Sequence, residues 1–274
     1  MKFTSSFTVL AVVIQLVVAS PTVYAAHLPA TTTGGSGGST VTVTSLDELT
    51  DAVSDDTAKI VVISGTISGN TVVKVGSNKS IVGASGATLA GVGLRVLNVE
   101  NVIIRNLKVS KVLAEAGDAI GIQALASTYV SVTNSVLHDH WKSSLVGHSD
   151  SNEDEDKAIT VTYALNKWYN LNSRLPSFRF GTGHIFNNYY YDSSDGINTR
   201  VGAQLLVENN VFSGLKKPLY STDSGYAVAT GNDFGDGENT AEAGTFSTAP
   251  YDYDLLDASA VVAAVSSAGA TLSF

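Results

Sequence analysis

Four asparagines recur at a constant interval in the second half of this 274-residue chain. Each asparagine is 22 residues from the next, and each is followed two positions later by an aromatic residue. The asparagines are Asn166, Asn188, Asn210 and Asn232, and the aromatic residues are Trp168, Tyr190, Phe212 and Phe234. An apolar-alternating segment, an asparagine and an aromatic segment, repeated at this period, are typical of one coil of a solenoid of stacked strands.

The repeat constrains the fold because a short strand cannot bury its apolar face alone, whereas stacked coils share one core. We therefore predict an all-β, right-handed, single-stranded parallel β-helix with a short capping helix. Asparagine tolerates the left-handed backbone of a sharp bend, and stacked asparagines can bond to each other as a ladder. Asn106 and Asn134 extend the pattern upstream with steps of 28 and 32 residues, whose excess over the period indicates loops.

Three regions are expected along the chain. Residues 1–25 have the features of a signal peptide, with Lys2, the apolar run Phe7 to Val18 and small residues near Ala25, so we expect secretion. Residues 26–40 form a flexible N-terminal segment, and residues 41–274 form one β-helix domain. Within it we expect a helix that begins after Ser45 and a final helix over 258–267.

The composition excludes several classes of function. There is no cysteine, so thiol catalysis and cysteine-based metal sites are excluded. The net charge of −9 argues against nucleic acid as a partner, and no apolar stretch outside the signal is long enough to span a membrane. An anionic polymer would need a local basic patch or a bridging cation. The acidic run Glu153 to Asp156 is interpreted as a solvated loop rather than a metal site.

Six segments together resemble the fungal pectate lyases of the pectin/pectate lyase superfamily. They are 79–83 (KSIVG), 102–107 (VIIRNL), 117–120 (GDAI), 138–147 (HDHWKSSLVG), 172–179 (NSRLPSFR) and 206–212 (LVENNVF). The resemblance implies a secreted, monomeric enzyme that cleaves de-esterified polygalacturonan by β-elimination. Its products would be unsaturated oligogalacturonides, released during the degradation of plant cell-wall pectin. A pectin lyase, which acts on methylated polymer, is a neighbour within the same fold.

The same resemblance assigns roles to three basic residues. By their place in the Arg-x-Pro-x-x-Arg motif, Arg174 would be the catalytic base and Arg179 a substrate contact, and Lys142 would bind substrate. Without the resemblance, the two arginines would be read as solvated residues or members of ion pairs. His138 and His140 are expected to be structural or hydrogen-bonding residues, because this chemistry needs no imidazole.

The chain departs from the family pattern where the calcium ligands are expected. The resemblance implies a calcium cofactor, but no Asp or Glu lies between Asp118 and Asp139. About thirty to forty residues, nearly two coils, are missing after residue 124, so the calcium ligands cannot be identified and no metal-ligating residue is assigned. Two hypotheses follow: a pectate lyase with altered calcium dependence, or a catalytically impaired homologue that binds pectic polysaccharide without cleaving it. A surface solenoid unrelated to pectin would leave the arginine motif unexplained.

Overall fold

The computed structural model describes residues 32–124 and 127–273. The expected signal peptide lies outside the described residues, as does the first part of the N-terminal segment. The described part of that segment is held against the sheet, because Asn101 Oδ1 accepts hydrogen bonds from the backbone N–H groups of Thr33 and Gly34, each at 2.7 Å. Across the described ranges, no helix is both long and apolar enough to pass through a bilayer.

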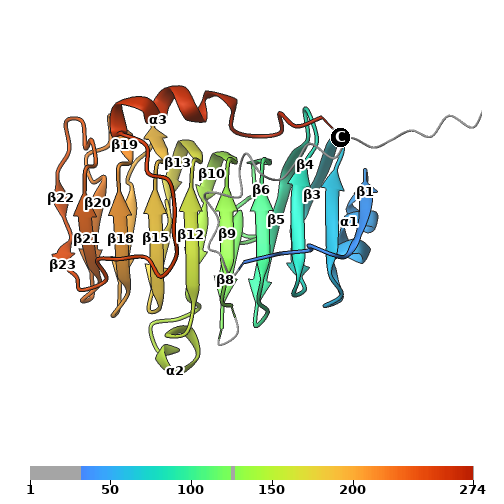
Figure 1. The fold of residues 1–274 in the computed structure, drawn as a ribbon, viewed down its shortest axis with the longest axis horizontal. Helices are drawn as coiled ribbons and strands as arrows, with labels where there is room; N and C mark the ends of the chain where they lie inside the picture. The colour runs from blue at the N-terminus through green and yellow to red at the C-terminus, as the bar shows by residue number, and fades with distance from the viewer. Residues whose placement is uncertain (1–31, 125–126, 274) are drawn as a thin grey trace, which may run out of the picture.

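Parallel strands wind into a β-helix, as Figure 1 shows, which confirms the predicted fold class. Ten strands from successive coils form one continuous sheet, with parallel pairing throughout. In order, they are β1 (Ser39–Val43), β2 (Lys59–Ile63), β4 (Lys79–Gly83), β6 (Val102–Arg105), β9 (Val130–Thr133), β12 (Thr160–Ala164), β15 (Thr182–Phe186), β18 (Gln204–Glu208), β21 (Tyr226–Thr230) and β23 (Glu242–Ala243).

The other strands form a second sheet with two rows. One row contains β7 (Lys108–Ser110), β10 (Val136–Lys142), β13 (Lys167–Ser173), β16 (Tyr189–Tyr191) and β19 (Val211–Ser213). The other contains β8 (Ile120–Gln123), β11 (Ser144–Val146), β14 (Ser177–Arg179), β17 (Ile197–Arg200), β20 (Leu219–Thr222) and β22 (Asn239–Thr240). The long strand β5 (Thr88–Leu97) joins them, pairing with β7 through its first residues and with β8 through its last, while β3 (Thr66–Val75) pairs with β5. Each coil therefore presents three faces.

The first helix lies at one end of the solenoid, the last helix runs along its side, and the helix between them lies in a loop. Helix α1 (Leu46–Val53) begins at the expected cap: the Ser45 hydroxyl accepts from the Glu48 N–H and the Glu48 carboxylate accepts from the Ser45 N–H, both at 3.2 Å. It buries Leu49 and Val53 against the first coils. The final helix is also confirmed, as α3 (Ala258–Ala264) followed by the 3₁₀ turn η3 (Val265–Ser267). Helix α2 (Glu153–Asp156) lies in the acidic loop.

The asparagine ladder is present, but its physical basis differs from the prediction. The Oδ1 atoms of Asn188, Asn210 and Asn232 each accept two hydrogen bonds, from the backbone N–H and the Nδ2 of the asparagine one coil earlier, at 2.9 to 3.0 Å. The left-handed bend is formed by the preceding residue of each coil. Those residues are Leu165, Asn187, Asn209 and Gly231, with φ between 47° and 66°.

This register also corrects the upstream assignment. Asn106 and Asn134 have φ of 53° and 49°, so they occupy the bend position and not the ladder position. In these two coils Leu107 and Ser135 occupy the ladder position. The Ser135 N–H donates to Asn166 Oδ1 at 2.9 Å, which joins this coil to the ladder. Asparagine serves both positions, because one needs a tolerant backbone and the other a side chain with a donor and an acceptor.

Aromatic residues stack inside the second half of the solenoid. Trp168, Tyr190 and Phe212 are buried, and successive ring centroids from Trp168 to Phe234 are 5.6, 4.7 and 5.5 Å apart. The spacing follows the coil-to-coil distance of a β-sheet. These rings, with the buried Val, Ile and Leu side chains of all three faces, form one continuous core that runs the length of the solenoid.

Candidate active site

Lys142 and Arg174 lie on adjacent coils at the same corner of the solenoid. Lys142 ends β10, and its register partner is Ser173, the residue before Arg174. The Arg174 carbonyl accepts from the Ser144 N–H at 2.8 Å, and the Lys142 carbonyl accepts from the Ala119 N–H at 3.3 Å. Three consecutive coils therefore bring residues 118, 142 and 174 to one place, where the chain turns into the β8, β11 and β14 row.

Arg174 forms an ion pair across the corner. Its Nη1 atom donates to both carboxylate oxygens of Asp118, at 2.6 and 2.7 Å. The Arg174 side chain is 27% exposed and that of Asp118 is 9% exposed. The Arg174 backbone is left-handed, with φ of 67°, and the Leu175–Pro176 peptide bond that follows is cis. This bend separates β13 from β14.

Arg179 ends β14 and lies beside Arg200 at the end of β17, its register partner. Asp150 pairs with both, bonding to Arg179 Nε and to Arg200 Nη2, the latter at 3.3 Å. Arg200 Nη2 also pairs with Asp223 at 3.0 Å. Gly147 makes room for Arg179, because a Cβ added there would stand 2.7 Å from the Arg179 Cβ. Arg179 and Arg200 therefore stand side by side, but both already bind carboxylates of the chain.

Lys142 differs from these arginines. It is half-buried, and no carboxylate among the described residues pairs with its ammonium. An ammonium that is fixed on a strand and has no internal counterion is suited to bind an external carboxylate. The three residues predicted from the sequence thus lie along the same side of the solenoid. Asp118 binds Arg174 and Asp150 binds Arg179, so a substrate carboxylate would have to displace these aspartates. The sequence analysis assigned neither aspartate, although Asp118 stands in one of the segments that carry the family resemblance and Asp150 follows another by three residues.

The acidic loop was predicted to be solvated, and this is only partly correct. Glu153, Asp154 and Glu155 are exposed. Asp156 is fully buried, and its carboxylate accepts from the backbone N–H groups of Ala124, at 2.8 Å, and His148, at 2.6 Å. Two charge-assisted hydrogen bonds compensate for burial of the carboxylate. The loop is thus fixed to the end of β8 and to its own first residues.

His140 is enclosed and uncharged. Nδ1 accepts from the Val112 N–H at 3.1 Å and Nε2 donates to the Val109 carbonyl at 3.0 Å, a pattern that requires the neutral ring. Burial lowers the pKa of His140 to about 4, although the hydrogen bonds to Val109 and Val112 oppose the shift. His140 therefore links two coils. The geometry agrees with the structural role expected of it.

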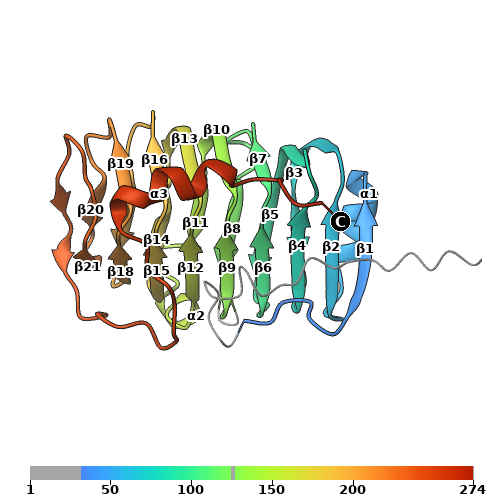
Figure 2. The ribbon, with the colours of Figure 1, turned by 45° about the horizontal axis from the view of Figure 1, so that its top comes forward.

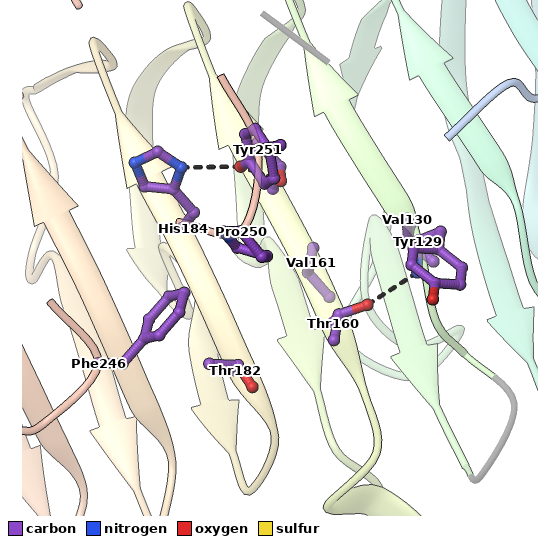
Figure 3. Close-up of a pocket in the computed structure, with 10 residues that line it drawn as sticks. Tyr129, Val130, Thr160, Val161, Thr182, His184, Phe246, Pro250 and Tyr251 are labelled. Carbon is purple, nitrogen blue, oxygen red and sulfur yellow. Dashed lines mark hydrogen bonds between the residues drawn. The ribbon is translucent and has the colours of Figure 1, made fainter. Parts of the chain in front are cut away.

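A small cavity on the ten-stranded sheet lies on a different face from the arginines (Figure 3). It measures about 120 Å³ and is lined mostly by apolar and hydroxyl side chains. At its edge, buried His184 bonds to Tyr251 Oη at 2.7 Å and to Glu208 Oε2 at 2.9 Å. Tyr251 also bonds to the Thr162 hydroxyl at 2.9 Å, and Tyr253 donates to Glu208 at 2.6 Å. This network fastens the segment before α3 to the sheet.

Comparison with known proteins identifies the family. The family model described as pectate lyase matches residues 115–271. Pectate lyase A of Aspergillus niger is 54% identical over 282 residues, which cover 91% of this chain and 87% of that protein. The chain belongs to the pectate lyase family. A second relative, a probable pectate lyase A of Aspergillus flavus, is 57% identical over 265 residues, 85% of this chain and 83% of that protein.

Solved pectate lyases share the fold. The pectate lyase of Bacillus sp. N165 in complex with trigalacturonate has a TM-score of 0.71 and 26% identity, and covers 88% of this chain and 95% of its own. Pectate lyase II of Xanthomonas campestris has a TM-score of 0.71 and 25% identity, over 87% of this chain and 96% of its own. The parallel β-helix seen here is thus the architecture of pectate lyases of known structure.

The alignments with the Aspergillus pectate lyases are longer than the parts of this chain that they cover. The Aspergillus niger alignment has 282 positions, whereas 91% of 274 residues is about 249. The Aspergillus flavus alignment has 265 positions, whereas 85% of 274 residues is about 233. In each pair about 32 or 33 positions have no residue in this chain. The alignments do not say where these positions fall, so a gap after residue 124 stays a prediction.

The described residues do not fit the calcium site that the family implies. Calcium takes about six to eight oxygen ligands, several of them charged. In the two described ranges, no group of three or more His, Asp or Glu side chains could hold a metal ion. Asp118 is bound by Arg174, and Asp139 is bound by His138, at 2.9 Å, and by Asn170, at 2.5 Å. Both carboxylates are engaged, and they provide too few oxygens.

Proposed function

We propose that this chain cleaves de-esterified polygalacturonan by β-elimination and releases unsaturated oligogalacturonides. The support is 54% identity to pectate lyase A over 91% of the chain, and 26% identity to a pectate lyase solved with trigalacturonate. Similarity that extends over nearly the whole chain favours a working lyase over a homologue that binds the polymer without cleaving it. Methylated pectin is the less favoured substrate, because cationic side chains bind carboxylates more strongly than uncharged esters.

One observation carries the assignment of the site: Lys142 and Arg174 stand on adjacent coils at one corner, with Arg179 and Arg200 on the same side. Adjacent coils are about 4.8 Å apart, so Lys142 and Arg174 form one pair of cations along the solenoid axis, and Arg179 and Arg200 form a second pair at the ends of β14 and β17. Polygalacturonan carries one carboxylate per sugar. Two pairs of cations are therefore complementary to the carboxylates of several sugars of the polymer.

The proposed reaction begins with removal of the C5 proton of a bound galacturonate by the neutral form of Arg174. The electron pair of that C–H bond becomes the C4=C5 double bond, the bond from C4 to the glycosidic oxygen breaks, and the departing oxygen takes a proton from water. Lys142 would bind the carboxylate attached to C5 and stabilise the negative charge that develops there. Arg179 would bind the carboxylate of a neighbouring sugar.

The ion pairs seen in the structure define a step before catalysis. Both Asp118 oxygens accept hydrogen bonds from Arg174 Nη1, so the guanidinium is already engaged before substrate binds. Arg174 must therefore exchange Asp118 for substrate, and lose a proton, before it can act as a base. Arg179 and Arg200 must likewise exchange Asp150 for the polymer. In this proposal the polymer lies along Lys142, Arg174, Arg179 and Arg200, a surface that we call the groove. Asp118 and Asp150 hold its arginines in place until the polymer displaces them.

The family resemblance implies calcium, which would neutralise the carboxylate next to C5 when bound. Since the described donor groups do not fit that ion, we propose that calcium dependence is weaker in this chain than in its relatives. Secretion after removal of residues 1–25 and a monomeric state are part of the same proposal. They follow from the apolar N-terminal run and from the family resemblance.

The proposed function is tested by incubating residues 26–274 with polygalacturonate and following the ultraviolet absorbance of the unsaturated uronide. We expect product to form both with added calcium and with chelator. Highly methylated pectin is the matched substrate, and product should form more slowly from it. If polygalacturonate binds without any product in either buffer, the chain is the impaired homologue instead.

A further inference from the structure

A second row of rings lies on the outer surface of the β10, β13 and β16 face. His138 stacks on Tyr169 with ring centroids 4.9 Å apart and planes within 10°, and Tyr169 stacks on Tyr191 at 5.0 Å and 17°. The three residues are register partners on successive coils. The side chains are partly exposed, that of His138 by 18%, in contrast to the buried stack of Trp168 and Tyr190.

The row of rings ends abruptly at His138. The next register partner is Ser110 on β7, and the one after it is Ala90 on β5. Among the described residues, Ser110 and Ala90 provide no ring to stack on this side of His138. A depression of about 560 Å³ opens there, lined by Ala90, Ser110 and His138 among others. Its volume is in the range of small-ligand sites.

Basic and hydroxyl groups surround the depression. Lys108, Lys111 and Lys167 line it, and Lys111 is exposed. Lys167 Nζ also lies over the Tyr169 and Tyr191 rings, 5.7 and 5.6 Å from their centroids. One acidic residue, Asp139, lines the site, and it is engaged by the His138 Nδ1 atom at 2.9 Å. The local charge is therefore positive on a chain whose net charge is −9.

The C-terminal segment forms one wall of the depression. Ser266 and Ala268, in and just after η3, line it. Figure 2 shows α3 and the chain after it running along the solenoid beside this face. The segment is fixed there, because the Gly269 N–H donates to the Asn134 carbonyl at 2.7 Å. The depression is thus formed by strands β5, β7 and β10 and by the C-terminal segment, and each of these elements is held in place by backbone hydrogen bonds.

We propose that this depression binds one hexuronate residue, with the C–H face of the sugar ring stacked on His138. The carboxylate would lie toward Lys108 and Lys111, and the ring hydroxyls toward Ser110 and Ser266. The sugar would continue the row of rings where Ser110 interrupts it. The site lies on a different face from Arg179 and Arg200. The identification of the hexuronate as galacturonate rests on the proposed function. The stacking on His138 and the positive charge of the site are independent of it.

The test measures binding and not turnover. Trigalacturonate is titrated by calorimetry into Arg174→Lys protein, in chelator, so that the ligand is not consumed. We expect two classes of site, one in the groove and one in the depression. Ser110→Tyr would place a ring where the sugar stacks and should remove the second class. Ser213→Tyr is the matched control: it extends the same row from its other end, next to Tyr191, and should keep both classes.

A second variant keeps the proposal testable if Ser110→Tyr does not fold. Replacing Lys108 and Lys111 together with Gln should weaken the second class by about fivefold. The proposal is overturned if the parent shows one class only, or if Ser110→Tyr and Ser213→Tyr bind alike. Loss of the groove class with the second class intact would contradict the proposed function and leave this inference standing.

Discussion

Asp118 and Arg174 are joined across an intervening coil. Asp118 precedes β8 and Arg174 precedes β14, and the coil between them carries Lys142. The arginine side chain is long enough to pass that coil, so the ion pair spans the corner at which Lys142 stands. If Lys142 and Arg174 bind substrate as proposed, the same ion pair affects both stability and substrate binding.

Replacing Asp118 with Asn should destabilise the fold. The carboxylate is 9% exposed and accepts two hydrogen bonds from a charged donor, so we expect a loss of about 2 kcal/mol in the free energy of unfolding. Urea denaturation followed by circular dichroism measures it. Asp154→Asn is the control, because Asp154 is 98% exposed and its pair with Lys157 should contribute less than about 0.5 kcal/mol. Equal effects of the two changes would contradict the proposed importance of the pair.

Arg174→Lys should abolish turnover while the protein remains folded. Lysine keeps the charge but lacks the planar guanidinium that reaches both Asp118 and the sugar. We expect the rate to fall by about 10²- to 10⁴-fold, the contribution usual for a positioned general base. The measurement is uronide absorbance, with near-ultraviolet circular dichroism as the check on folding. A folded variant with turnover near that of the parent would rule out Arg174 as the base.

Asn188→Ala should cost more stability than Asn232→Ala. Asn188 is fully buried; its Nδ2 donates to the Tyr163 and Phe186 carbonyls, and its Oδ1 accepts from Asn166. Removing the side chain leaves several buried groups unsatisfied, so we expect a loss of about 3 kcal/mol. Asn232 stands at the open end of the ladder, and its loss should cost about 1 kcal/mol. Similar denaturation midpoints for the two variants would show that position in the ladder does not matter.

Stability should fall as the pH decreases from 6.5 towards 4. Burial lowers the pKa of His140 to about 4, so between these values the unfolded chain binds a proton that the folded chain does not. The contribution is fully present above pH 6.5 and is lost as the pH falls through the folded value; it reaches at most about 3 kcal/mol. His140→Gln should flatten this part of the curve of unfolding free energy against pH. Exposed His148→Gln is the control and should leave the slope as it is.

Calcium should raise the melting temperature very little. Asp118 is engaged by Arg174, and Asp139 by His138 and Asn170, so these described carboxylates provide no preformed set of oxygens for the ion to bind. Differential scanning calorimetry with a calcium series and with chelator measures the shift. A large rise that saturates with concentration would reveal a metal site that this donor set does not explain.

The fold could be predicted from the sequence because every coil of the solenoid has the same structural requirements. An asparagine and an aromatic residue recur every 22 residues, as at Asn188 and Tyr190, because each coil needs the same ladder hydrogen bond and the same ring in the core. The shift of one position for Asn106 and Asn134 could not be predicted, since bend and ladder positions are neighbours and both favour asparagine. Only the strand register in the structure distinguishes the bend position from the ladder position.

The site was predictable only in part. Lys142, Arg174 and Arg179 were found through sequence motifs, and the register brings Lys142 and Arg174 together. Their partners Asp118 and Asp150 lie 56 and 29 residues from the arginines they bind, and no local pattern predicts such contacts. Asp156 was read as one of four similar acidic residues, because burial of a single carboxylate depends on which N–H groups the folded loop presents.

The returning C-terminal segment changes how this solenoid should unfold. In a simple stack each coil contacts only its neighbours, so coils at the ends can separate one at a time. Here Gly269 and Ala270 bond to the carbonyls of Asn134 and Asn106, and Leu272 pairs with Ala84. The last residues synthesised are thus bonded to coils formed from the first half of the chain. The early and late coils should therefore lose their structure in one cooperative transition, and removal of residues 258–274 should divide that transition into separate steps.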